Sequence, residues 1–364
     1  MTKTYSFYPG CSLERNAYAY LQSTKAIAKP LDIELDELED WNCCGATEYI
    51  SLELLPAFAL IGRNLAIAEA QKEENGSENL VAPCSACYIN LRKTDHYMRE
   101  SQALTEQVNE ALEAGGLHYT PGAVNVRHLL DVVVNDIGYD AVREKVVRPL
   151  TGLRVAPYYG CFILRPDFAS IDDPEYPMIL DKLLEALGAE VVDYSVKGQC
   201  CGGHMTQISE STSMEMIHYL IKAAADAEAD AIVTVCPMCQ LNLDAFQGDM
   251  NRHFKTGYRM PVLYFTQMMG LAFGLTPREL GIGKGLVSAA AALSKIEDEA
   301  LRSEDGSLEL AQSAVEELAE VPASLLDAGR WTATAKFWSL AAGFWKLVGD
   351  GMKRFGHPSE GREE

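Results

Sequence analysis

The segment "NLVAPCSAC" at residues 79–87 returns as "AIVTVCPMC" at residues 231–239, and this pair decides the interpretation of the fold. Each segment is a short apolar run typical of a buried strand, followed directly by a C-x-x-C motif. A second pair surrounds a lone cysteine, with "FYPGCS" at 7–12 and "YYGCFI" at 158–163. The sequence therefore contains an internal duplication with cysteines at matching positions.

All ten cysteines of the 364-residue chain belong to this duplication. Each half has a lone cysteine, then a Cys-Cys-Gly triplet, then the C-x-x-C motif. Corresponding motifs are 150, 157 and 152 residues apart. The first half contributes Cys11, Cys43, Cys44, Cys84 and Cys87, and the second contributes Cys161, Cys200, Cys201, Cys236 and Cys239.

Strand and helix patterns alternate in both halves, which predicts an α/β fold of two tandem Rossmann-like domains at 1–150 and 151–290. Helices are expected, for example, at 51–71 and 211–229. Most cysteines then follow strands, at the edge of an open sheet where ligands bind. Both C-x-x-C motifs open helices, whose N-termini favour thiolates. Buried parallel strands are expected at 4–8, 33–38, 78–82, 124–128, 153–159, 189–194, 231–235 and 261–264.

Composition narrows the class of function. The net charge of −21, from 31 basic and 52 acidic residues, argues against nucleic-acid binding, which needs clustered Lys and Arg. The start "MTKTYSFYPG" has no apolar signal region, and no run approaches the roughly 18 apolar residues of a membrane span. We therefore expect a cytoplasmic chain, in which ten thiols indicate metal or redox chemistry rather than disulfides.

The adjacent pair Cys43 and Cys44 points to a polynuclear site. Adjacent cysteines rarely bond to each other, because the geometry is poor. A structural zinc ion takes four ligands and so does an ordinary cubane iron–sulfur cluster, whereas each half offers five. A bridging thiolate, or a cluster with an unusual number of iron sites, uses all five. The alternative is four zinc ligands and one free thiol in each half.

With C-x31-C-C-G-x38-C-x2-C in the first half and C-x38-C-C-G-x33-C-x2-C in the second, the chain resembles the CCG-domain (cysteine-rich domain) family. The likeness to the B subunit of heterodisulfide reductase covers residues 1 to about 290. It implies one noncubane [4Fe-4S] cluster in each half, held by the five cysteines of that half. Some relatives hold a different metal in the first half. In methanogens, the two clusters of this family face a shared cleft and split a disulfide by one-electron steps.

The resemblance also implies partners. No C-x2-C-x2-C-x3-C-P run for a ferredoxin cubane is present, and no G-x-G-x-x-G follows a strand as a flavin site would require. We therefore expect electrons to arrive through a ferredoxin-like subunit and a flavoprotein subunit. A similar domain occurs in the membrane-attaching subunit of some succinate dehydrogenases, which implies the alternative of an electron relay to membrane quinone.

Five further residues are candidates around the cysteines. His204, in "CCGGHMTQ", suits proton donation to a leaving thiolate, while the alternative is a hydrogen-bond donor to cluster sulfur or a plain loop histidine. The glycines beside the cysteines are expected to let the backbone approach the cluster and to offer N–H groups to sulfide. They are Gly10, Gly45, Gly160 and Gly202.

The C-terminal part differs in composition from the rest. Residues 291–329 form an acidic linker, with ten acids and one base between 296 and 329. Residues 330–358 are predicted to form an amphipathic helix with five bases and one acid. Its aromatic side suits a membrane interface, such as the inner face of the membrane, and docking to a partner or to the protein's own surface is the alternative. The row on that side is Trp331, Trp338, Trp345 and Met352.

Overall fold

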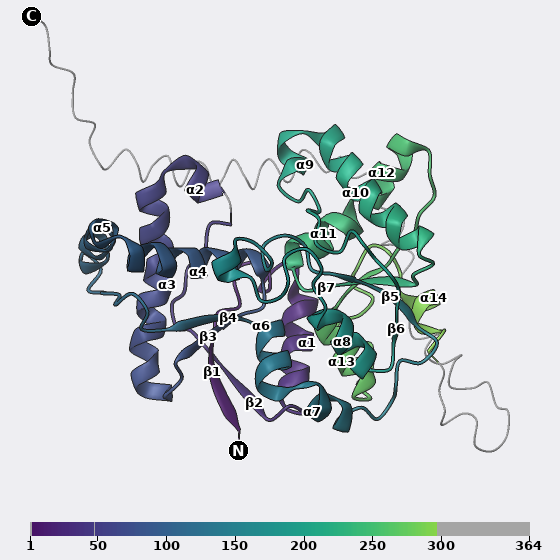
Figure 1. The fold of residues 1–364 in the computed structure, drawn as a ribbon, viewed down its shortest axis with the longest axis horizontal. Helices are drawn as coiled ribbons and strands as arrows, with labels where there is room; N and C mark the ends of the chain where they lie inside the picture. Colours follow the sequence, from purple (N-terminus) through teal and green to yellow (C-terminus); the bar gives the residue numbers. More distant parts are fainter. Residues whose placement is uncertain (1, 47, 297–364) are drawn as a thin grey trace, which may run out of the picture. The chain divides into compact units, whose positions relative to one another are not determined.

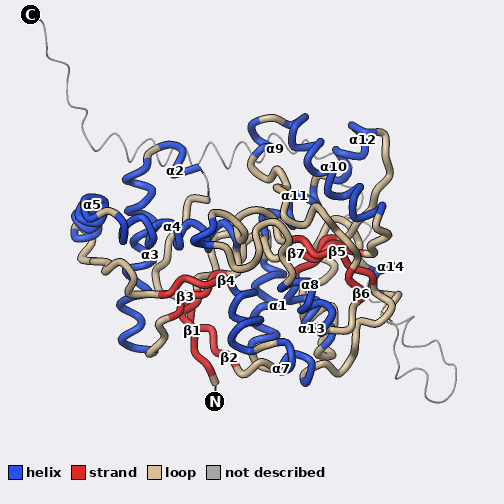
Figure 2. The backbone as a smooth tube through the Cα atoms, viewed as in Figure 1, coloured by secondary structure: helices blue, strands red, loops and turns tan. Residues whose placement is uncertain are grey.

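The computed structural model describes residues 2–46 and 48–296, and in this part each half of the chain forms one four-stranded parallel sheet (Figure 1). The strand orders are β2-β1-β3-β4 and β6-β5-β7-β8, so both halves share one topology (Figure 2). All eight predicted strands are present, which confirms the duplicated α/β fold. They are β1 (Lys3–Phe7), β2 (Ile33–Glu37), β3 (Asn79–Ala82), β4 (Asn125–His128), β5 (Arg154–Tyr158), β6 (Glu190–Val191), β7 (Ala231–Thr234) and β8 (Val262–Tyr264).

The central strands are buried on both faces. In β3 and β7 the runs "LVA" and "AIVT" are fully covered, because helices lie on both sides of each parallel sheet. The register of β1 against β3 pairs Phe7 with Val81. This pairing brings the carboxyl ends of the two strands to one edge, where the lone cysteine and the first C-x-x-C motif follow.

Helices connect the strands, and the two long ones that the sequence predicts are α3 and α10. The expected helix at 51–71 is divided, because Glu53 is extended (φ −145°, ψ 120°) between α2 and α3. The helices are α1 (Tyr18–Ala28), α2 (Glu48–Leu52), α3 (Leu54–Asn75), α4 (Ser85–Glu100), α5 (Gln102–Glu113), α6 (Leu129–Asp131), the π-helix η1 (Val132–Ile137), α7 (Tyr139–Glu144), the 3-10 helix η2 (Asp167–Ala169), α8 (Ile179–Ala186), α9 (Met205–Ile208), α10 (Glu210–Asp226), α11 (Pro237–Ala245), α12 (Gln247–Phe254), α13 (Phe265–Ala272) and α14 (Ala290–Leu293).

The two halves pack on each other through α1 and α13, which lie between the two sheets (Figure 1). The buried hydroxyls of Ser23 in α1 and Thr266 in α13 are 2.7 Å apart. Nearby, Gln22 donates from its side-chain amide to the carbonyl of Arg278 at 2.8 Å. One hydrophobic core therefore draws residues from both halves, and the described residues of both belong to one compact unit.

Two predictions fall largely outside the described residues. The acidic linker at 291–329 is described only to residue 296, and α14 spans its predicted start. The amphipathic helix at 330–358 is not described. The domain limits at 150 and 290 stay predictions. Within residues 2–46 and 48–296, the helices are too short or too polar to cross a membrane.

Candidate metal centre

The ten cysteine thiols lie in one continuous row that passes from the first half to the second. All ten are free, and the pKa of each thiol is shifted by its neighbour in the row. The Sγ atoms of Cys11 and Cys43 are 3.4 Å apart, and so are those of Cys44 and Cys87. The order along the row is Cys11, Cys43, Cys44, Cys87, Cys84, Cys236, Cys239, Cys201, Cys200, Cys161.

This row is symmetric about its midpoint. Each half runs from the lone cysteine through the Cys-Cys pair to the C-x-x-C motif, and Cys84 meets Cys236 where the halves join. Among the described residues, no three Cys, His, Asp or Glu side chains gather around one point as ligands for a single metal ion. The thiols are therefore arranged in two matching sets of five that share a border.

Helix starts position the C-x-x-C motifs. Cys84 is the N-cap of α4 and Cys236 is the N-cap of α11, both with extended backbone. The second cysteine of each motif lies in the first helical turn and is buried. The partial positive charge of a helix N-terminus favours thiolates. Hydrogen bonds with neighbouring thiols nevertheless raise the pKa of Cys84, Cys87 and Cys239, and of the four thiols only Cys236 has a lowered pKa. The prediction that both motifs open helices is confirmed.

Glycines shape the loops around the sulfurs. Gly45 and Gly202 have φ of +73° and +76°, and their N–H groups lie 3.4 Å from the Sγ atoms of Cys43 and Cys200. A Cβ on Gly10 would lie 2.7 Å from Sγ of Cys87. At Gly160 the corresponding distance, to Sγ of Cys239, is 3.2 Å. A side chain at Gly10 or Gly160 would therefore occupy space beside a thiol. The role of the four glycines beside a cluster stays a prediction.

Two asparagines hold the Cys-Cys-Gly loops in place, one in each half. The side-chain amide of Asn90 donates to the carbonyl of Cys44 at 3.0 Å and also to that of Ala46. Asn242 donates in the same way to the carbonyl of Cys201 at 2.7 Å. Both asparagines are buried and lie three residues after the second cysteine of a C-x-x-C motif. The repeat "C-x-x-C-x-x-N" was visible in the sequence, but sequence reasoning did not use it.

Two buried tyrosines also form hydrogen bonds to the same loops. The hydroxyl of Tyr8 donates to the carbonyl of Asn42, and that of Tyr158 donates to the carbonyl of Gln199, each at 2.7 Å. Both carbonyls immediately precede a Cys-Cys pair, and both tyrosines lie three residues before a lone cysteine. Buried hydrogen bonds of this kind fix the orientation of metal ligands. Each loop is therefore held by hydrogen bonds from two buried side chains, one tyrosine and one asparagine.

The neighbouring thiols shift one another's proton affinity. Hydrogen bonds with Cys161 and Cys201 lower the pKa of Cys200 to about 2, and its bond with Cys200 raises the pKa of Cys161. Hydrogen bonds with Cys43 and Cys87 lower the pKa of Cys44. The thiolate is the form that binds metal. Each half therefore contains a thiol with a lowered pKa, whereas the pKa of most other thiols in the row is raised.

His204 lies beside the second set of cysteines. It lines a cavity of about 20 Å³ together with all five cysteines of the second half and Ser85 of the first. Its Nδ1 is 2.7 Å from Oε1 of Glu48, which belongs to α2 in the first half. In the duplication the position of His204 corresponds to Thr47, so this pair is an asymmetric feature that joins the halves. Its proton-donor role stays a prediction.

The donor set fits an iron–sulfur cluster in each half. Every candidate ligand is a cysteine sulfur, the usual ligand of such clusters. The space kept free by Gly10 and Gly160, and the N–H groups of Gly45 and Gly202, lie directly beside sulfur atoms. Hydrogen bonds from backbone N–H groups to cluster sulfur set the reduction potential of such centres.

Comparison with known proteins supports this interpretation of the cysteines. A family model described as a cysteine-rich domain, CCG, matches residues 5–92 and again residues 155–244. The two matches correspond to the two repeats. Each contains all five cysteines of its half, from the lone cysteine to the C-x-x-C motif.

Several curated proteins are similar over nearly their whole length. The "8-methylmenaquinol:fumarate reductase membrane anchor subunit" of Wolinella succinogenes is 34% identical over 79% of this chain and 99% of its own. The B subunit of the ferredoxin:CoB-CoM heterodisulfide reductase of Methanosarcina mazei is 30% identical over 80% and 96%. A protein of Archaeoglobus profundus, named as similar to the B subunit of heterodisulfide reductase, is 31% identical over 76% and 92%.

A solved structure shares the fold. A hypothetical protein from Helicobacter pylori aligns with a TM-score of 0.62 over 79% of this chain and 52% of its own, at 14% sequence identity. This likeness supports the arrangement of the two sheets and says nothing of the chemistry.

Proposed function

The chain belongs to the cysteine-rich CCG-domain family, and we propose that it is the iron–sulfur subunit of a heterodisulfide-reductase-like complex. Like its relatives, it is a subunit of an oxidoreductase. It would hold two noncubane [4Fe-4S] clusters, one on the five cysteines of each half, with the first site also open to another metal. The reaction would be electron transfer to or from a disulfide or thiol substrate.

The single observation that carries this proposal is the symmetric row of ten thiols. Its midpoint, where Cys84 meets Cys236, makes the two ligand sets neighbours. When bound, an iron–sulfur cluster supplies one-electron transfer. Reduction of a disulfide takes two electrons and two protons and releases two thiols. Two adjacent one-electron centres match this demand.

The chain's own residues would hold the sulfurs and supply a proton. Asn90, Asn242, Tyr8 and Tyr158 fix the loops that carry the ligands. His204, which lines the cavity beside the second set, would deliver a proton to the departing sulfur of the substrate. The carboxylate of Glu48, 2.7 Å from Nδ1, would orient the imidazole.

The count of cysteines supports the proposal that this chain works with partner subunits. All ten belong to the row, so none remains for a ferredoxin-type cluster in this chain. We propose that a flavoprotein subunit is the source of the electrons and that a ferredoxin-like subunit passes them to this chain. Relatives named as subunits of larger reductases support this arrangement.

A second function is supported by a specific observation. One relative, at 34% identity, is named as the membrane anchor subunit of a reductase for 8-methylmenaquinol and fumarate. In that case the two clusters would relay electrons between a soluble dehydrogenase of the succinate dehydrogenase type and quinone. The predicted helix at 330–358 would attach the chain peripherally to the inner face of the membrane.

One experiment separates the two functions. The anaerobically purified chain is treated with a thiol and an oxidant, and its EPR spectrum is recorded. A new signal that depends on the thiol supports disulfide chemistry. No response to thiol, together with a change in the spectrum on adding quinone and liposomes, supports the relay instead and contradicts the first function.

His204 gives a direct test of the proton-transfer role. We expect His204→Gln to lower the rate of disulfide reduction by about 10²-fold, as loss of a general acid does. The iron content should not change, because His204 is not a proposed ligand. The measurement is thiol release at steady state, with electrons supplied by a chemical reductant.

The matched control for this test is His253→Gln, which removes an exposed imidazole from the last turn of α12. It should leave the rate at the wild-type value. A wild-type rate in His204→Gln, or equal losses in the two variants, would contradict a proton-donor role for His204.

A further inference from the structure

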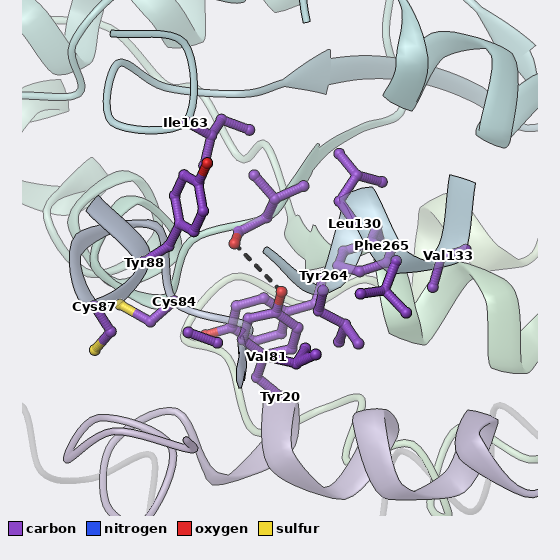
Figure 3. Packing of buried hydrophobic residues seen from close by; sticks show 14 of the residues in the cluster. Tyr20, Val81, Cys84, Cys87, Tyr88, Leu130, Val133, Ile163, Tyr264 and Phe265 are labelled. Atoms are coloured by element: carbon purple, nitrogen blue, oxygen red, sulfur yellow. Dashed lines mark hydrogen bonds between the residues drawn. The ribbon is translucent and has the colours of Figure 1, made fainter. Parts of the chain in front are cut away.

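Tyr20 is buried at the point where the two halves meet. It belongs to α1 in the first half and is fully inaccessible to solvent. Its hydroxyl lies 3.0 Å from the carbonyl oxygen of Pro83 and 3.3 Å from that of Val235. Since a phenol has a single O–H donor, one proton is shared between the two carbonyls. Figure 3 shows Tyr20 among the buried residues around it.

The two carbonyls have matching places in the duplication. Pro83 immediately precedes Cys84, and Val235 immediately precedes Cys236. These two cysteines are the pair that joins the halves of the thiol row. Tyr20 therefore makes a hydrogen-bonded bridge from the backbone of one C-x-x-C motif to the backbone of the other.

The ring of Tyr20 is held firmly in this position. It stacks on Tyr264, the last residue of β8 in the second sheet, with ring centroids 4.2 Å apart and planes 4° from parallel (Figure 3). Phe265 packs against it edge-on at 6.2 Å. The hydroxyl of Tyr264 donates in turn to Oε1 of Gln240, in the helix that carries Cys239. The bridge is thus braced by side chains from the opposite half.

His128 adds a second polar group at the same place. The ring is fully buried, which lowers its pKa. The nearby carbonyls of Pro83 and Val235 raise the pKa in opposition. Burial prevails and lowers the pKa of His128 to about 4, so the imidazole is neutral. Its Nδ1 accepts the N–H of Leu130 at 3.1 Å, which assigns the proton to Nε2.

We propose that Tyr20 is a positioning residue that fixes the separation of the two metal centres, and through it their electronic coupling, by tying together the backbone carbonyls that precede Cys84 and Cys236. This inference rests on the proposed function, because it requires a redox centre in each half. Electron exchange between two centres falls steeply as their separation grows. The hydroxyl of Tyr20, which lies where the two halves meet, therefore controls how strongly the two centres are coupled for two-electron transfer.

The test is the variant Tyr20→Phe, which keeps the ring and its stacking and removes only the hydroxyl. Wild type and variant are purified anaerobically and assayed for iron and sulfide. Both are then reduced stepwise, and the microwave-power saturation of each EPR signal measures the spin coupling between centres. Because loosening a supporting shell by about 1 Å already degrades a site, we expect the coupling to fall about twofold or more at unchanged iron content.

Tyr194→Phe is the matched control. Tyr194 is also buried, and its hydroxyl donates to the carbonyl of Leu220 at 3.0 Å, entirely within the second half. This variant loses a comparable buried hydrogen bond and should keep the wild-type coupling. Wild-type coupling in Tyr20→Phe, or an equal loss in Tyr194→Phe, would overturn the inference and leave the proposed function intact. A wild-type chain with a single paramagnetic centre would overturn the inference alone, and a chain with none would overturn the proposed function with it.

Discussion

Replacing Cys44 by alanine is expected to remove the first metal centre and leave the second in place. Cys44 is buried between Cys43 and Cys87 in the thiol row, so its loss breaks the first set of five. The iron content should fall by about half, since each half is proposed to hold one cluster of equal size. Activity should fall by more than the roughly 10–100-fold that loss of a supporting contact costs a metal site.

The matched variant is Cys201→Ala, which takes the same place in the second half. It should remove the other centre to the same extent. Iron and sulfide assays on both anaerobic variants, with turnover measured alongside, make the comparison. If either variant keeps the full iron content, or if both lose all of it, the assignment of one independent cluster to each half is wrong.

Gly10→Ala is expected to disrupt the first metal centre without touching a ligand. The new Cβ would lie 2.7 Å from Sγ of Cys87, which is closer than real Cβ contacts allow. The sulfur must therefore move, and we expect metal affinity in the first half to fall roughly 10–100-fold, as for other losses of ligand support. Iron retained after dialysis against a chelator measures the effect.

Gly76→Ala separates this steric effect from backbone strain. Gly76 has φ +71°, close to the +74° of Gly10, but a Cβ there would meet nothing within 4 Å. Both variants should lose about 1–2 kcal/mol of stability from the left-handed backbone. Only Gly10→Ala should lose iron. Equal iron retention in the two variants would show that the space beside Cys87 is not needed by a metal centre.

The fold was predictable because it is encoded twice. Strands such as β3 and β7 are continuous apolar runs bounded by cysteine motifs, and the two copies support each other. The division between α2 and α3 was missed, because the backbone at Glu53 leaves the helical conformation inside a continuous helical pattern. Hydrophobic periodicity reflects the order of the side chains and cannot reveal a single extended residue.

The ten cysteines that we propose as ligands were likewise visible in the sequence, whereas their arrangement was not. Spacing alone assigns five cysteines to each half, but only the packing of the halves brings Cys84 beside Cys236. Tyr20 carries no motif, because its two partners are backbone carbonyls 63 and 215 residues away. Asn90 and Asn242 could have been found from their common place after each C-x-x-C motif.

The asymmetric features are the hardest to infer from a repeat. His204 was identified by its place after the Cys-Cys-Gly triplet, but its partner Glu48 lies in the other half and has no sequence signal. Such a contact depends on how α2 and the loop before α9 meet. Duplication predicts what the halves share, and the structure is needed for what differs between them.

The most direct test is the metal content of the wild-type chain purified without oxygen. Iron, acid-labile sulfide and zinc are measured on one sample and related to protein concentration. With two [4Fe-4S] clusters held by the ten cysteines, we expect about eight irons and a matching amount of sulfide per chain. Zinc with little iron in that preparation would contradict the central claim and favour four-ligand zinc sites instead.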